Sequence, residues 1–192
     1  LYLFDLTTTI TDSTFYLNRS SGSGAAIRQS DGSLTVRNST FYDNSALFGD
    51  GGAISSGALT TLLVNTTLSG NTASSSGGGI YFSNPVDFDS AIISNSTIAN
   101  NTANQDGGGL FSSFDVITLN NTIVADNSAS SSGDDISGYV NGSYSLVEST
   151  SGFTNQGSNF ITGQDPELLP LADNGGSTLT HALTTTSVAI DA

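Results

Sequence analysis

Apolar and polar residues alternate along most of this chain, in short stretches that Gly and Asn interrupt. Two and four residues ahead of a recurring Asn, the side chains are mostly aliphatic, and polar residues stand between many of them. A period of two predicts β-strands with one buried face. The buried positions are Leu34, Val36, Thr61, Leu63, Ala91, Ile93, Ile117 and Leu119. Because Ser, Thr, Asn and Gly are poor helix formers, we expect almost no helix between these strands.

One motif recurs throughout: Asn, a hydroxyl residue, a small or β-branched residue, an apolar residue, two variable positions, Asn, any residue and Ala. Full copies occupy residues 38–46, 65–73, 95–103 and 121–129, and a weaker copy occupies 12–20. Internal repetition at a fixed period is the signature of a solenoid. The closing Asn residues, 26 to 30 positions apart, are Asn18, Asn44, Asn71, Asn101 and Asn127.

A second motif, a tetrad that begins with Gly and ends in an aliphatic residue, runs in phase with the first. Together the two motifs predict a right-handed, single-stranded parallel β-helix of five to six coils with about 27 residues per coil. We expect the coils in residues 1–144 and an irregular tail module, packed on the last coils, in residues 145–192. A faint leucine-rich-repeat spacing at residues 59–65 is absent from the other copies. The tetrads are 24–27, 51–54, 77–80, 107–110 and 133–136.

Coils about 4.8 Å apart would place equivalent residues in vertical columns. We expect two aliphatic columns in the interior, an Ala column at a tight corner and a ladder of Asn amides, with Asn and Gly supplying left-handed turns. The first of these columns is Ile27, Ile54, Ile80, Leu110 and Ile136, and the second, which begins with two aromatic residues, is Phe15, Phe41, Leu68, Ile98 and Val124.

Charge excludes some partners. The net charge is −14 and the only cationic side chains are Arg19, Arg28 and Arg37. Such a chain cannot neutralise a nucleic-acid backbone or an anionic membrane surface, so we expect neither as a partner. No apolar run approaches the roughly 20 residues that span a bilayer. There is no Cys, and the chain opens at Leu1 without a signal-peptide pattern, so we expect a mature or trimmed fragment.

Catalytic groups are scarce. Asp134 and Asp135 form a carboxylate pair, the kind of group that general acid–base hydrolysis uses, but they occupy the Gly-tetrad position and no His or Arg is near in sequence. We therefore interpret them as a structural corner. The three Arg residues are interpreted as surface groups that pair with Asp12, Asp31 or Asp43 or are solvated.

His181 is the only histidine, and we interpret it as a hydrogen-bonded structural residue because zinc generally takes three or four protein ligands. Asp50 and Asp106, with Ser76 between them in the repeat, match no calcium motif, so we expect no cofactor and only weak, diffuse calcium binding. Several Asn-x-Ser/Thr sequons follow from the repeat itself. They begin at Asn18, Asn38, Asn65, Asn95, Asn100, Asn120 and Asn141.

The motifs Gly51–Ile54 and Phe41–Asn44 resemble the repeats of polymorphic outer-membrane proteins and related pectate-lyase-like surface β-helices. Residues 165–183 and 189–192 resemble the C-terminal module of bacterial choice-of-anchor Q proteins. Those are exported surface proteins in which a β-helix precedes an anchoring signal. The resemblance implies a β-helix at the cell surface and no known reaction.

Two functions remain open. The first is a non-catalytic, extracellular or cell-surface protein of the adhesin or structural kind, which stacks end to end with copies of itself or binds matrix polysaccharide. It needs no catalytic site, so we predict none. The alternative is a polysaccharide-binding or polysaccharide-degrading β-helix, in which Tyr16, Tyr42 and Tyr81 would stack on sugar rings.

Overall fold

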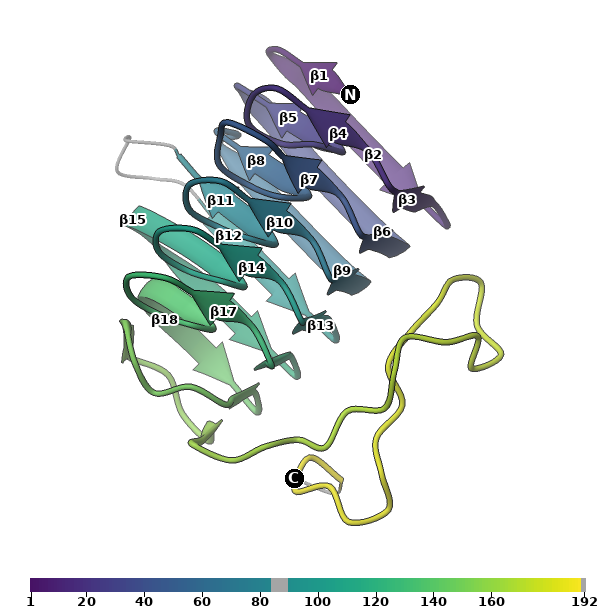
Figure 1. The fold of residues 1–192 in the computed structure, drawn as a ribbon, viewed down its shortest axis with the longest axis vertical. Helices are drawn as coiled ribbons and strands as arrows, with labels where there is room; N and C mark the ends of the chain where they lie inside the picture. The colour runs from purple at the N-terminus through teal and green to yellow at the C-terminus, as the bar shows by residue number, and fades with distance from the viewer. Residues whose placement is uncertain (84–89, 191–192) are drawn as a thin grey trace.

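The chain winds into a stack of parallel coils with a C-terminal tail (Figure 1). The structure is a computed structural model that describes residues 1–83 and 90–190, with the backbone alone at residues 90 and 113–115. Within those residues every regular element is a β-strand, and every pairing between named strands is parallel. The predicted solenoid is therefore confirmed.

Each full coil contributes strands to four columns, which form one large sheet and a small five-stranded one. The first column holds β1 (Tyr2–Leu3), β5 (Ile27–Gln29), β8 (Ile54–Ser56), β11 (Ile80–Phe82) and the starts of β15 (Leu110–Asn120) and β18 (Ile136–Ser143). The second holds β2 (Leu6–Thr11), β6 (Gly32–Tyr42), β9 (Thr60–Ser69), β12 (Ser90–Ser94), the ends of β15 and β18, and β20 (Phe153–Asn155).

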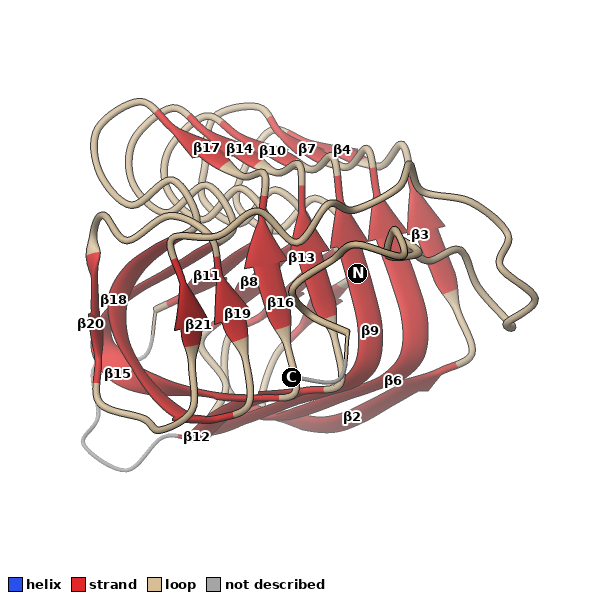
Figure 2. Ribbon diagram, turned by 90° about the horizontal axis from the view of Figure 1, so that it is seen from below, coloured by secondary structure: helices blue, strands red, loops and turns tan. Residues whose placement is uncertain are grey.

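We call the third column the third face. It holds β3 (Thr14–Tyr16), the ends of β6 and β9, β13 (Thr97–Ala99), β16 (Ile123–Ala125), β19 (Leu146–Val147) and β21 (Ile161–Thr162). The small sheet holds β4 (Arg19–Ser20), β7 (Ser45–Ala46), β10 (Thr72–Ala73), β14 (Thr102–Ala103) and β17 (Ser128–Ala129). Figure 2 shows both sheets along the stack.

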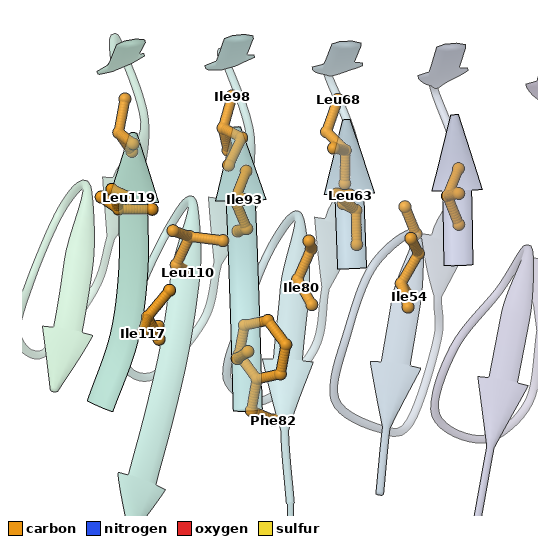
Figure 3. Close-up of a cluster of buried hydrophobic side chains, with 14 of the residues drawn as sticks. Ile54, Leu63, Leu68, Ile80, Phe82, Ile93, Ile98, Leu110, Ile117 and Leu119 are labelled. Carbon is orange, nitrogen blue, oxygen red and sulfur yellow. The ribbon is translucent and has the colours of Figure 1, made fainter. Parts of the chain in front are cut away.

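The interior consists of the predicted aliphatic columns. Ile54 pairs with Ile80, and Ile80 pairs with Leu110; all three side chains are fully buried (Figure 3). Phe15 stacks on Phe41, with ring centroids 4.8 Å apart. The Ala column, expected at a corner, instead lies in the small sheet, where Ala46, Ala73 and Ala103 are in register. Because like residues lie over like residues, a single short motif builds a continuous core.

Three corners per coil require left-handed torsions. One is the first Gly of the tetrad: Gly51 has φ of 66°, and a Cβ there would lie 2.2 Å from the carbonyl oxygen of Ile54. The second is the opening Asn of the motif, such as Asn65 with φ of 51°. The third is the residue before the closing Asn, for instance Asp43. The closing Asn residues themselves have no left-handed torsion, although each follows a residue that does; their role is hydrogen bonding.

The closing Asn residues form a buried ladder of one polarity. Asn44 Nδ2 donates to Asn71 Oδ1 at 2.8 Å, and Asn71 Nδ2 donates to Asn101 Oδ1 at 2.8 Å. Each acceptor oxygen also receives the backbone N–H of the preceding Asn, as Asn71 Oδ1 does from Asn44 at 3.0 Å. The side chains of Asn44, Asn71 and Asn101 are fully buried, so this inner ladder satisfies polar groups that water cannot reach.

The opening Asn residues form a second, exposed ladder that runs the opposite way. Asn65 Nδ2 donates to Asn38 Oδ1 at 3.1 Å, and Asn38 Nδ2 donates to the Asp12 carboxylate at 3.1 Å. Asn121 donates in the same sense to Asn95 at 3.2 Å. The sequons at Asn38, Asn65 and Asn95 therefore coincide with this outer ladder.

The C-terminal tail differs in part from its expected place. We expected residues 145–192 on the last coils, and β19, β20 and β21 do extend the stack there. Beyond β21 the chain turns back as an irregular hairpin with two antiparallel bridges, Leu168 to Leu183 and Ala172 to Thr180. The hairpin crosses the third face toward the first coils (Figure 2), where Thr40 Oγ1 donates to the Leu179 carbonyl at 2.7 Å. Residues 191–192 lie outside the described residues.

Candidate functional site

The carboxylate pair Asp134–Asp135 lies at the last full coil and is bound to backbone and amide groups. Asp135 Oδ1 accepts the side-chain N–H of Asn127 at 2.9 Å and its backbone N–H at 3.3 Å. Its Oδ2 accepts the backbone N–H of Ser149 at 2.7 Å. Asp134 Oδ1 accepts the backbone N–H of Ala129 at 3.1 Å, at the end of the small sheet. The pair thus terminates the inner ladder and the small sheet together.

Burial raises the pKa of Asp135 from 3.8 to about 6, in spite of its hydrogen bonds from Ser149 and Asn127, and the nearby charge of Glu148 adds to the rise. The Asp135 side chain is only 1% exposed. A buried carboxyl with a raised pKa is a common mark of a general acid, but this one is enclosed by its own donors. Asp135 therefore has a raised pKa, as many catalytic carboxyl groups do, but its hydrogen bonds are those of a residue that ends the inner Asn ladder.

The three Arg residues do not converge. Arg28 lies over the ring of Tyr2, with Cζ 5.4 Å from the ring centroid, Arg19 lies in β4 of the small sheet, and Arg37 is exposed in β6. Within the described residues none of them forms an ion pair, so of the two expectations, pairing with Asp12, Asp31 or Asp43 or solvation, the pairing does not occur.

His181 holds the tail on the third face. Its Nδ1 lies 2.7 Å from the Leu169 carbonyl, and its Nε2 lies 3.0 Å from Ser69 Oγ in β9. Because a carbonyl only accepts, Nδ1 donates to the Leu169 carbonyl, and Nε2 pairs with the Ser69 hydroxyl. Nearby, burial and the charge of Asp165 raise the pKa of Asp126, while His181 lowers it. The sole histidine therefore makes a structural link between the tail and the coils, as predicted.

Asp50, Ser76 and Asp106 occupy one column and bind one another through backbone groups. Asp50 Oδ1 accepts the Ser76 N–H at 3.1 Å, and the Asp106 N–H donates to Ser76 Oγ at 3.4 Å. Among the residues that the structure describes, no three His, Asp or Glu side chains gather as a metal site would require.

Two stacked aromatic pairs face outward on different sides of the solenoid. Tyr16 stacks on Tyr42 with ring centroids 5.2 Å apart at the edge of the third face, and Tyr81 stacks on Phe111 at 5.1 Å in the first column. Burial, and then the charge of Asp50, raise the pKa of Tyr81. Tyr16 and Tyr42 were expected to share an outward position of the repeat, whereas the partner of Tyr81, Phe111, was not anticipated; each stack is two rings long.

One concave site was not anticipated. A pocket of about 560 Å³ lies between the last coils and the end of the tail, where Asn121, Tyr144, Asn159, Phe160 and Ala189 contribute to its walls. The signal in the sequence was a break in the repeat: Tyr144 occupies the turn position that Asn121 and Asn95 hold one and two coils earlier. Functional positions often violate the local rule of a repeat, so this departure could have been flagged.

Comparison with known proteins gives one match. Residues 1–160 match the family model of the right-handed beta helix region. No curated protein and no solved structure matches the chain at a significant level. In the described part of the chain, no helix is long and apolar enough to cross a membrane.

Proposed function

The chain belongs to the family of right-handed β-helix regions, and on that premise we propose that it is a non-catalytic scaffold of the extracellular space or cell surface. The observation that carries the proposal is the use of Asp134 and Asp135 as hydrogen-bond acceptors for Ala129, Asn127 and Ser149. A hydrolase or lyase of this fold would need such carboxylates free to reach substrate. Here both oxygens of the buried Asp135, and Oδ1 of the exposed Asp134, are occupied in closing two hydrogen-bonded columns.

The extracellular setting is supported by composition and by the tail. The chain has no Cys and stabilises itself by repetition, hydrogen-bonded ladders and a continuous aliphatic core. Its residues 165–183 resemble the C-terminal module of anchored bacterial surface proteins, and this part of the tail crosses the third face and binds Thr40 and Ser69. A tail fastened along the coils would transmit load from an anchor to the whole solenoid.

Self-association is a subsidiary proposal. Within the described residues the strands of the first coil, β1 to β4, pair on one side only, with β5, β6 and β7. Leu1, Tyr2, Phe4 and Leu6 are more than half exposed there. A further stretch of chain ahead of Leu1, or a second copy, that added a strand to this edge would bury them, and we propose the second copy. Light scattering over a range of concentrations should show mass above the monomer, and a monomer at every concentration contradicts this part of the proposal.

An activity screen distinguishes the scaffold from the alternative function, a polysaccharide-degrading β-helix. The protein is incubated with oligogalacturonate and neutral glycans, with and without calcium, and reducing ends are counted. We expect no cleavage. Cleavage that Asp134→Ala or Asp135→Ala abolishes, while the variants keep the β-sheet circular-dichroism spectrum, would overturn the scaffold proposal.

A surface location is tested on the organism that makes the protein. Protease treatment of intact cells, followed by mass spectrometry of the released peptides, should recover peptides of this chain. Their recovery only after lysis contradicts the proposed location.

A further inference from the structure

The pocket at the last coils is formed where two columns of the repeat change residue type. In the corner column, Tyr144 replaces Asn and keeps the left-handed torsion, with φ of 52°. In the next column, Phe160 follows Ser145 and Thr122, which have hydroxyl groups. A bulky residue rarely adopts positive φ, and the cost is of order 1–3 kcal/mol. The chain therefore tolerates strain at the point where it also places an aromatic ring.

The pocket has the size and the lining of a small-molecule site. Its volume of about 560 Å³ lies within the range of roughly 300–1,000 Å³ that ligand pockets occupy. Tyr144 is 58% exposed, so its ring is accessible, whereas Phe160 packs against the hydrophobic core. Tyr144, Phe160 and Ile123 contribute aromatic and aliphatic surface to its lining.

The polar groups at the pocket are amides and hydroxyls. Asn121 donates to Asn95 through Nδ2 at 3.2 Å, which leaves its Oδ1 to accept from a ligand. Asn159 adds an exposed amide that both donates and accepts. The hydroxyl of Ser145 is already engaged with the Thr122 N–H and the Ser143 carbonyl. Two amides beside an aromatic ring can bind vicinal hydroxyls while the ring covers an apolar face.

The charge of the site further limits the chemical class of the ligand. Among the residues that the structure describes, no Asp, Glu, Lys, Arg or His lines the pocket, and the chain as a whole carries a net charge of −14. A ligand with a carboxylate would meet no cationic partner and a repulsive field. A neutral sugar ring has the apolar C–H face and the hydroxyl edge that this lining complements.

We propose that this pocket binds one pyranose unit of a neutral glycan, with Tyr144 stacked on the sugar ring and Asn121 and Asn159 bonded to its hydroxyls. The site is distinct from the Tyr16–Tyr42 pair near the first coils. The scaffold role proposed above does not depend on it, since a scaffold without this pocket would still be a scaffold.

The test uses four hexasaccharides of matched length: cellohexaose, mannohexaose, xylohexaose and hexagalacturonate. Binding to the whole chain is followed by amide chemical shifts and calorimetry. At least one neutral hexamer should bind and shift the signals of residues 121–123, 144–146 and 159–161, and hexagalacturonate should bind at least tenfold more weakly. If no neutral hexamer binds, if the uronate binds best, or if the shifts map to Tyr16 and Tyr42, the proposal is wrong.

Variants at residue 144 separate binding from folding. Tyr144→Asn restores the residue that earlier coils carry at this corner, so it should fold at least as stably as the parent chain while its affinity falls at least tenfold. Tyr144→Phe keeps the ring and should retain binding within about threefold. Tyr139→Asn, at an exposed tyrosine outside the pocket, is the matched control and should leave affinity unchanged. Full affinity in a folded Tyr144→Asn variant contradicts the proposal.

Discussion

The side-chain amide of Asn127 donates a 2.9 Å hydrogen bond to the Asp135 carboxylate, and this bond ends the inner Asn ladder. The outer ladder, which runs in the opposite direction, ends in the same way at Asp12. In both ladders the last amide donates into a carboxylate. An amide at the end of the ladder needs an acceptor for its N–H, and a carboxylate oxygen accepts without requiring a further acceptor of its own, so a carboxylate suits the end of a chain of aligned amides.

The inner ladder should contribute more stability than the outer one. Asn71→Ala removes the acceptor of two N–H groups of Asn44 in a fully buried site, and each buried group left without a partner costs about 1–3 kcal/mol. We expect urea unfolding to show a loss of at least about 2 kcal/mol. The matched variant Asn65→Gly removes an exposed outer-ladder amide and keeps the left-handed turn, and should cost less than about 1 kcal/mol. Equal losses would contradict the distinction.

Asp135 should make stability depend on pH in a defined window. Because burial raises its folded-state pKa from 3.8 to about 6, the unfolded chain releases this proton first as pH rises. The contribution of Asp135 is therefore fully present below about pH 4 and is lost as pH rises to about 6, with a total of about 3 kcal/mol. Unfolding free energies measured from pH 4 to 7 should fall more steeply in the parent chain than in Asp135→Asn. Parallel pH curves would refute this assignment.

The Gly at the tetrad corner should be irreplaceable for two reasons. At Gly51 an added Cβ meets both a φ of 66° and the Ile54 carbonyl oxygen at 2.2 Å, so Gly51→Ala should cost about 3 kcal/mol or more. At Gly175 the φ is 89° but no heavy atom lies within 4 Å, so Gly175→Ala tests the torsion alone and should cost about 1–2 kcal/mol. Thermal or urea denaturation that ranks the two variants in the reverse order contradicts the corner geometry.

Removing the hydrogen bonds that hold the tail hairpin on the third face should loosen the hairpin without unfolding the coils. His181→Ala removes the links to Ser69 and Leu169, and Thr40→Val removes the link to Leu179. Each lost hydrogen bond is worth about 1 kcal/mol, so amide exchange in residues 165–187 should accelerate about fivefold in Thr40→Val, which loses one bond, and about 30-fold in His181→Ala, which loses two. Thr35→Val, on the uncovered outer surface of β6, serves as the control and should leave this exchange unchanged. Faster exchange throughout the coils would mean that the tail stabilises the whole solenoid.

Much of the fold could be predicted because one residue pattern dictates one coil. The register of Phe41 over Phe15 and of Ile54 beside Ile80 follows from spacing alone. The path of the tail could not be predicted, since Thr40 and Leu179 share no repeat and meet only through tertiary packing. The cap at Asp135 was assigned to a corner, but its partner Ser149 lies outside the motif. The pocket lies where Tyr144 departs from the repeat, and the period of a repeat does not predict the surroundings of a residue that departs from it.

The parallel stacking of coils is tested most directly by a disulfide, because the chain contains no native cysteine. Ser45 and Thr72 are register partners in adjacent coils of the small sheet, with hydroxyl oxygens 2.9 Å apart. Adjacent strands bring Cα atoms to about 5 Å, within the span of a disulfide. Oxidation of the double variant Ser45→Cys/Thr72→Cys should give an intramolecular bond, whereas Ser45→Cys/Thr102→Cys, two coils apart at roughly 10 Å, should not. Failure of the first pair to cross-link, or equal cross-linking of both, would contradict the stacked coils.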